Sequence, residues 1–146
     1  MKKQEYLDLK KQHEKEVADF PVAYAFNDEQ LIEALKKLGA KSVSECVTVL
    51  GHGDVVKKTD AKRFVDMLKK QVIDLKFKMI DDNEFAEAAF LYEMDNHEYA
   101  INWSGDEDVL RCFAMKEEEL DELGLSDAYL RARKQHMKNA REWGVI

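Results

Sequence analysis

The chain has 146 residues, of which 45% are apolar and 36% charged, with one proline and six glycines. This length is common for one domain with one core, and it leaves little room for a second core of similar size. No window approaches the roughly 18 consecutive apolar residues of a membrane span, so we expect no membrane association. Thirty acidic residues against 23 basic ones give a net charge of −7, which disfavours nonspecific binding of nucleic acid.

The N-terminal segment and the two cysteines indicate a cytoplasmic protein. Residues 1–17, MKKQEYLDLKKQHEKEV, start with basic residues as a signal peptide does, but charges continue where its apolar region should be. Cys46 and Cys112 each lie in an apolar run, and two thiols do not make a disulfide framework. We therefore expect two buried free thiols, both within strands.

Helical spacing dominates the start of the chain. Apolar positions recur every three or four residues from Tyr6 to Phe20, which predicts a helix that ends before Pro21. Asn27 is then placed to cap a second helix, with Gln30 in the capping-box position. Gly39 follows the last periodic residue and is expected to end this helix in the left-handed conformation.

The pattern changes after residue 45. Residues 46–50 and the pair Val55-Val56 predict a short hairpin, with Gly51-His52-Gly53-Asp54 as its turn. A glycine-rich loop of this kind could also hold a phosphate, but such a loop is followed by a helix, whereas here a strand follows. Thr59 and Asp60 then begin a long amphipathic helix, which residues 81–83 interrupt.

The second half of the chain begins with a helix that is apolar around most of its circumference, residues 84–94, and such a helix is normally covered on several sides. Asp95 and Asn96 are expected to end it. Residues 97–103 alternate with period two and residues 109–114 are mostly apolar, which predicts a second hairpin with residues 104–108 as its turn. Two helices follow, one ended by Gly124 and one from Ser126 to Trp143.

These elements predict an α+β fold, in which two hairpins pair into one small antiparallel sheet covered by helices. We expect a single domain over residues 1–146, with residues 115–146 as a helical C-terminal extension. No internal repeat, linker or low-complexity segment divides the chain.

The segment from Tyr92 to Leu110, YEMDNHEYAINWSGDEDVL, contains the densest group of polar candidates. If residues 97–103 form a strand, His97 and Glu98 point to opposite faces and cannot bind one ion together. Only an irregular chain at residues 95–96 would bring Glu93, Asp95 and His97 together. The segment lacks the second histidine of an HExxH motif and the spacing of a calcium loop. We therefore expect no catalytic residue, metal or cofactor here, and expect His97 to fix a helix-to-strand corner.

The other candidate residues, two cysteines, two histidines and a basic stripe, are better explained by structural roles than by catalysis or ligand binding. Neither cysteine has a local nucleophile motif, so Cys-His catalysis is not expected. His13 and His136 lie on otherwise apolar helix faces, where a histidine is more often a core residue than a ligand. The last helix has a basic stripe, which could bind an acidic partner but more often is a solvated face; it consists of Arg131, Lys134, Lys138 and Arg141.

The same segment resembles a family of short uncharacterised bacterial proteins, found also in phages and mobile elements, with the motif E-M-x-N-H-E-Y-x-I-N followed by G-D-x-D. The matching residues are Glu93, Met94, Asn96, His97, Glu98, Tyr99, Ile101, Asn102, Gly105, Asp106 and Asp108. Residues 20–31, FPVAYAFNDEQL, also resemble the opening of that family, so the resemblance spans residues 5–115. The chain departs at Glu107, where the family has tryptophan. The resemblance implies a cytoplasmic accessory protein of phage or mobile-element origin, and brings no established activity.

We expect a non-enzymatic module that binds a protein partner whose identity the sequence does not give. Its candidate binding residues are Asn96, His97, Glu98, Tyr99, Asn102, Trp103, Asp106 and Asp108. Two alternatives stay open. An acidic inhibitor of a nucleic-acid enzyme would need residues 106–108 and the acids of residues 117–122 clustered on one surface. A metal-dependent hydrolase centred on His97 would need Glu93, Asp95 and His97 in one pocket, whereas scattered acids around a flat apolar surface favour the binding module.

Overall fold

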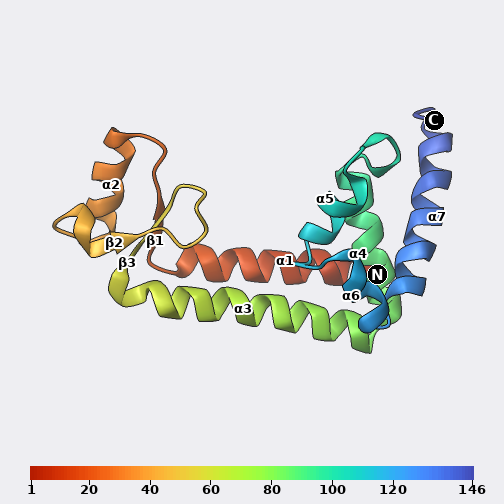
Figure 1. The fold of residues 1–146 in the computed structure, drawn as a ribbon, viewed down its shortest axis with the longest axis horizontal. Coiled ribbons are helices and arrows are strands. Elements are labelled where there is room, and N and C mark those ends of the chain that lie inside the picture. Colours follow the sequence, from red (N-terminus) through yellow and green to blue (C-terminus); the bar gives the residue numbers. More distant parts are fainter. The chain divides into compact units, whose positions relative to one another are not determined.

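The fold is mainly helical and includes one small sheet, in a computed structural model that describes all residues, 1–146 (Figure 1). The helices are α1 (Lys2–Asp19), α2 (Asp28–Leu38), α3 (Lys58–Asp81), α4 (Asn83–Asn96), α5 (Gly105–Arg111), α6 (Glu117–Glu122) and α7 (Ser126–Glu142). The strands are β1 (Val22–Tyr24), β2 (Cys46–Val47) and β3 (Asp54–Lys57), and the two 3₁₀ turns are η1 (Val43–Glu45) and η2 (Tyr99–Ile101). The predicted α+β class is confirmed. None of the helices has the length and apolar character needed to cross a membrane.

The chain forms two compact units. The helical unit comprises residues 1–10 and 72–146, and the sheet unit comprises residues 11–71. Each of the long helices α1 and α3 contributes residues to both units. The expectation of a single domain over residues 1–146 stays a prediction.

The sheet unit is built on three antiparallel strands in the order β1-β3-β2, which lie beside α2 in Figure 1. The predicted hairpin of β2 and β3 is confirmed, with Val47 opposite Val56. Strand β1 was not predicted, because three residues after a proline are too few to show an alternating pattern. Val22, Val56 and Phe64 form the buried centre of the unit.

The hairpin turn is organised by one buried carboxylate. Asp54 accepts hydrogen bonds from the backbone N–H groups of Val49 (2.7 Å), Leu50 (3.0 Å) and His52 (3.3 Å), and from the Thr48 hydroxyl (2.9 Å). Burial alone would raise the pKa of Asp54, but these hydrogen bonds outweigh it and lower the pKa to about 2. The chain turns at Gly51-His52-Gly53 as predicted, but the turn begins after Val47 and Asp54 is already the first residue of β3. The N–H groups that a phosphate would need already bind Asp54.

Helix α2 begins and ends as predicted. The Asn27 side chain accepts the N–H of Gln30 at 2.8 Å, and the Gln30 side chain accepts the N–H of Phe26 at 2.8 Å. Gly39 ends the helix with a left-handed φ of 71°. Local sequence therefore specifies both ends of this helix.

Asn27→Ala should lower the free energy of unfolding by about 1 kcal/mol, because the N–H of Gln30 loses its partner at the first turn of the helix. Chemical denaturation followed by circular dichroism measures the change. Asn27→Asp keeps the accepting oxygen and should leave the midpoint almost unchanged. Equal losses in both variants would contradict the capping role.

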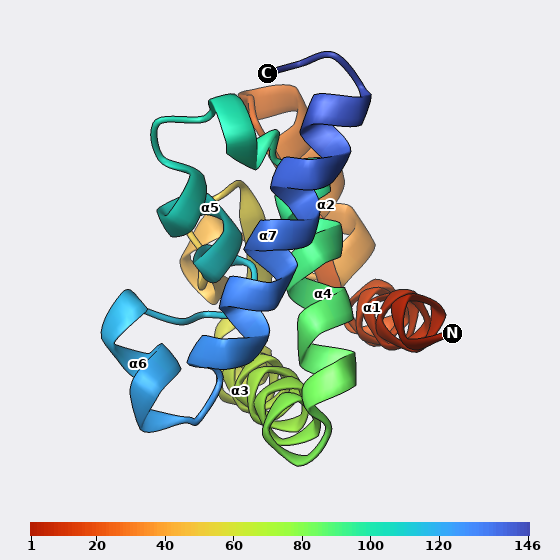
Figure 2. The same cartoon turned by 90° about the vertical axis from the view of Figure 1, so that its right-hand side faces the viewer.

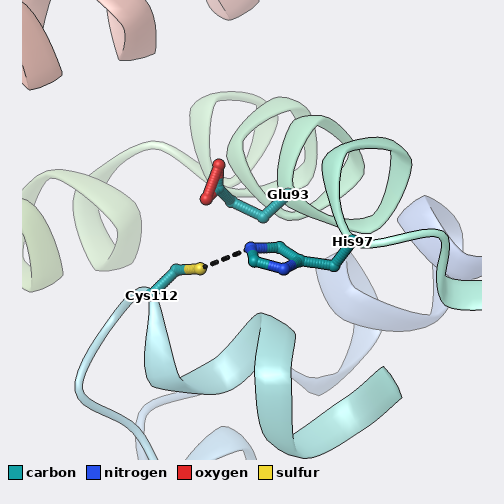
Figure 3. A group of neighbouring side chains, drawn as sticks. All are labelled: Glu93, His97 and Cys112. Carbon is teal, nitrogen blue, oxygen red and sulfur yellow. Dashed lines mark hydrogen bonds between the residues drawn. The ribbon is translucent and has the colours of Figure 1, made fainter. Parts of the chain in front are cut away.

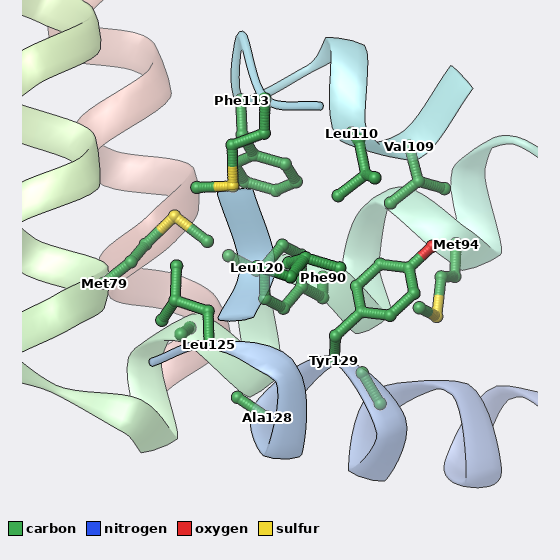
Figure 4. Close-up of a cluster of buried hydrophobic side chains, with 14 of the residues drawn as sticks. Met79, Phe90, Met94, Val109, Leu110, Phe113, Leu120, Leu125, Ala128 and Tyr129 are labelled. Atoms are coloured by element: carbon green, nitrogen blue, oxygen red, sulfur yellow. The ribbon is translucent and has the colours of Figure 1, made fainter. Parts of the chain in front are cut away.

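The helical unit is centred on α4, as the sequence predicted. Asp82 caps this helix by accepting the N–H of Phe85 at 3.1 Å, so the predicted interruption at residues 81–83 is also confirmed. Helix α7 lies along α4 (Figure 2). The apolar core between α4 and its neighbours is drawn in Figure 4, where Phe90 meets the rings of Phe113 and Tyr129 edge-on at 5.1 and 5.0 Å.

The second predicted hairpin is wrong. Residues 97–103 form the C-cap of α4 and the turn η2, and residues 105–111 form α5. The acids at positions 106–108 occupy the first turn of α5, where they stabilise the positive end of the helix dipole. Val109, Leu110 and Phe113 are buried at helical spacing, so Cys112 lies at a helix end and not in a strand. The expected burial of the thiols is also wrong, since Cys46 is half-buried and Cys112 exposed.

Candidate functional site

The segment between α4 and α5 is held in a defined conformation by Asn102. Its Nδ2 donates to the carbonyl of His97 at 3.1 Å and to Asp108 Oδ2 at 2.9 Å, and its Oδ1 accepts the N–H of Ser104 at 2.9 Å. Glu98 turns the chain with a left-handed φ of 51°. The predicted helix-to-strand corner at His97 is wrong, because α4 is followed by η2 and no strand. The side chain that fixes this turn of the chain is Asn102.

Three side chains that can bind metal converge between α4 and α5 (Figure 3). Glu93 and His97 lie four residues apart on α4, one helical turn, and so share a face. Cys112 follows α5, with its Sγ 3.3 Å from His97 Nε2. One ligand atom from each of the three residues lies within 4.8 Å of the others.

Glu93 is a carboxylate inside the apolar core, with only 1% of its surface exposed. Its Oε1 pairs with the Lys10 ammonium at 3.2 Å. Lys10 also lies over the rings of Tyr6 and Tyr92, 5.4 and 5.3 Å from their centroids. A buried carboxylate is costly unless it is paired, so the position of Glu93 requires compensating positive charge.

The surroundings of the Cys112 sulfur favour the neutral thiol over the thiolate. Burial, together with the neighbouring Glu93 carboxylate, which accepts its hydrogen bond, raises the pKa of Cys112 to about 12. A nucleophilic cysteine needs the opposite shift, toward the thiolate. The expectation that Cys112 and His97 do not perform Cys-His catalysis stays a prediction.

Asp106 and Tyr99 belong to a second group of predicted site residues. Asp106 Oδ1 accepts the hydroxyls of Tyr99 at 2.7 Å and Tyr129 at 2.5 Å. Burial and these hydrogen bonds raise the pKa of Tyr99 to about 12, and raise that of Tyr129 as well. The hydrogen bond of Asp106 with Tyr129 links α5 to α7, so a role in stabilising the fold explains these three side chains.

Asp95 does not join Glu93 and His97. It bonds to the buried His136 of α7, with Oδ1 and Nδ1 2.6 Å apart. His136 Nε2 accepts the N–H of Ala100 at 3.1 Å, so the ring proton is on Nδ1. This agrees with the expectation that His136 is a structural residue.

Trp103 stands apart from both groups because its side chain is fully exposed. It borders a hollow of about 440 Å³ together with Asp106, Glu107 and Glu117. The same three acids border a second hollow, of about 480 Å³, where Glu118 and Glu119 join them. We call this continuous region the acidic surface: Trp103, Asp106, Glu107, Glu117, Glu118 and Glu119.

The remaining predicted binding residues do not share one pocket. Asn96 and Glu98 are exposed, and Glu98 borders a separate hollow of about 190 Å³ with Ile101 and Trp143. The basic stripe of α7 lines a further hollow, in which Arg131 pairs with Glu87 at 3.5 Å. This pairing supports the solvated-face interpretation of the stripe.

Sequence reasoning missed the cluster of Glu93, His97 and Cys112. The available signal was the spacing Glu93-x-x-x-His97, which matters only if His97 continues the helix instead of starting a strand. Cys112 gave no such signal, because its place beside His97 depends on how α5 packs against α4.

The comparisons with known proteins give one match. Neither the curated proteins nor the solved structures include a match to this chain. A family model described as a family of unknown function, DUF7659, matches residues 5–142. The match runs through α6 and α7 and so extends past residue 115, where the resemblance noted in the sequence ends. With nearly the whole chain covered, the protein belongs to this family of unknown function.

Proposed function

We propose that the protein is a non-enzymatic, cytoplasmic binding module that docks a basic partner protein through the acidic surface. The observation that carries the proposal is Trp103, a fully exposed tryptophan on a segment fixed by three hydrogen bonds of Asn102. Generic duplex DNA is not the expected partner, given the net charge of −7. The phage or mobile-element origin implied by the resemblance is part of this proposal.

Trp103 supports docking because a large apolar ring in water gains free energy when a partner covers it. Tryptophan is among the residues that most often dominate protein–protein interfaces. The hydrogen bonds of Asn102 order the segment in the free protein. Binding therefore costs less conformational entropy than it would for a flexible loop.

The charge around Trp103 supports a basic partner. Three acids and one base, Arg133, border the hollow that Trp103 lines, and five acids and two bases, Arg111 and Lys116, border the adjoining hollow. Arg111 pairs with Glu107 at 2.9 Å, and Lys76 pairs with Glu119 at 3.2 Å, whereas Glu117 and Glu118 have no ion pair. A partner with lysine or arginine beside an apolar pocket would complement both the acids and the indole, which also attracts cations over its face.

The same acids favour a second candidate, an inhibitor of a nucleic-acid enzyme. Such an enzyme presents a basic groove to its substrate, and part of the acidic set that this alternative needs, the acids of residues 106–107 and 117–119, borders one hollow. Asp108, Asp121 and Glu122 do not border it. The hydrolase alternative has less support, because Asp95 bonds to His136 instead of joining Glu93 and His97.

Trp103→Ala should weaken partner binding about tenfold or more, as expected for a central aromatic anchor. Wild-type protein and the variant are immobilised at equal loading and incubated with lysate of the encoding organism. Proteins captured only by wild type are identified by mass spectrometry. The leading candidate is then purified and titrated calorimetrically against both forms at two salt concentrations.

Two further variants test the surface. Trp143→Ala removes an exposed indole that borders a different hollow and should leave the affinity unchanged. The double variant Glu117→Gln, Glu118→Gln should weaken binding and reduce its salt dependence. The proposal fails if no purified candidate loses affinity in Trp103→Ala, or if Trp143→Ala loses as much.

A further inference from the structure

We propose that Glu93, His97 and Cys112 form a binding site for one divalent transition-metal ion of the zinc class. This site is separate from the acidic surface and does not depend on the proposed docking function. The sequence expectation was that no metal binds here, and it rested on placing His97 in a strand.

The positions of the ligand atoms fit one small ion. Zinc ligands lie about 2.0–2.3 Å from the metal in a tetrahedral arrangement, which puts a sulfur and a nitrogen ligand about 3.5 Å apart. Cys112 Sγ and His97 Nε2 are 3.3 Å apart, and the Glu93 carboxylate completes a group within 4.8 Å. The sulfur and the nitrogen already have the spacing of zinc ligands, and the Glu93 oxygen would approach them by rotation of its side chain.

The ligand set selects the class of metal. A thiolate and an imidazole favour zinc and its neighbours in the first transition row over calcium or magnesium. Calcium needs six to eight oxygen ligands, and this group offers only one carboxylate. Three protein ligands also leave a fourth position for water. His97 and Cys112 are only partly buried, so solvent can reach the group.

The electrostatics of the group favour a cation. Glu93 is almost fully buried, and its ion pair with Lys10 involves Oε1 at 3.2 Å. The carboxylate also accepts the hydrogen bond of the Cys112 thiol, and loss of the thiol proton would free it to bind a metal, while Lys10 holds Oε1 as an outer partner of the kind that orients metal-binding carboxylates. Binding replaces the thiol proton: the S–H bond breaks, a sulfur–metal bond forms, and one proton is released to solvent.

The position of the group gives a bound ion a mechanical effect. Glu93 and His97 lie at the end of α4, and Cys112 lies at the end of α5. An ion would therefore join the two ends of the segment that contains Trp103. It would restrict that segment in addition to the hydrogen bonds of Asn102.

Calorimetric titration of tag-free, fully reduced, metal-free protein with Zn²⁺ tests the site. We expect one equivalent to bind with sub-micromolar affinity. Cys112→Ser, which changes only the ligand sulfur, should reduce this affinity at least about a hundredfold, and His97→Gln and Glu93→Gln should each reduce it strongly. Cys46→Ser is the matched control, because Cys46 lies in the sheet unit, and it should bind Zn²⁺ as wild type does.

Co²⁺ gives a spectroscopic signal that appears only if these residues bind the metal, and not if they merely stabilise the fold. Wild-type protein should develop a near-ultraviolet sulfur-to-cobalt charge-transfer band, and Cys112→Ser should lack it while keeping the wild-type circular dichroism spectrum. The inference is overturned if no saturable binding occurs, or if Zn²⁺ binds equally well to wild type and Cys112→Ser. In that case the group is a thiol–imidazole hydrogen bond beside an ion pair.

Discussion

Phe90→Ala should lower the free energy of unfolding of the helical unit by about 3–5 kcal/mol. Phe90 is fully buried on α4, and its ring packs edge-on against Phe113 of the α5 end and Tyr129 of α7. Removing the ring loses apolar burial and leaves a cavity, because neighbours from separate helices cannot all move inward. Urea denaturation followed by near- and far-ultraviolet circular dichroism measures the loss.

Phe77→Ala is the matched control for this experiment. Phe77 belongs to the same unit, on α3, but is 68% exposed, so the same substitution should change stability by less than about 0.5 kcal/mol. A Phe90→Ala midpoint close to that of the control would show that α4 is peripheral. That result would contradict the description of the core.

Asp54→Asn should destabilise the sheet unit by about 2 kcal/mol at neutral pH, the free energy that corresponds to the lowered pKa. The folded pKa of about 2 lies below the ordinary value of 3.8. The carboxylate therefore contributes stability above about pH 4, and this contribution is lost as the pH falls through the folded pKa. The wild-type midpoint should fall between pH 4 and pH 2, and the variant should lack this part of the fall.

Asp19→Asn is the control, since Asp19 is an exposed carboxylate paired with Lys15 within one helix at 2.7 Å. It should cost less than about 1 kcal/mol and should leave the fall between pH 4 and pH 2 intact. Thermal denaturation at a series of pH values compares the three proteins. The same acid dependence in wild type and Asp54→Asn would rule out the proposed role of the hairpin turn.

Local signals predicted the elements that depend on local interactions. The caps Asn27 and Gly39 fix the ends of α2, and the glycine-rich turn fixes the hairpin of β2 and β3. Residues 104–108 were ambiguous, because acidic residues after a serine suit both a hairpin turn and the first turn of a helix. The choice depends on the burial of Val109 and Leu110 against α4, which is a tertiary interaction.

The candidate sites also differ in how far local sequence determines them. Trp103, Asp106 and Glu107 lie close together in sequence, so their proximity could be predicted, whereas Glu117, Glu118 and Glu119 join them only through the packing of α6 near α5. The cluster of Glu93, His97 and Cys112 could not be predicted. It requires His97 to extend α4 and α5 to return toward it, and neither follows from the residues between them.

The helical unit is interrupted in sequence, and this affects the order in which a growing chain can fold. The sheet unit is one continuous segment, residues 11–71, and can fold as soon as it has been synthesised. Tyr6 instead packs in the helical unit against Phe85 and Phe113, with ring centroids 6.0 and 5.8 Å away. During synthesis the Tyr6 ring therefore stays exposed to solvent until more than half of the chain has been made, because its partners Phe85 and Phe113 come later in the sequence. The first residues of this protein are among the last to reach their final positions.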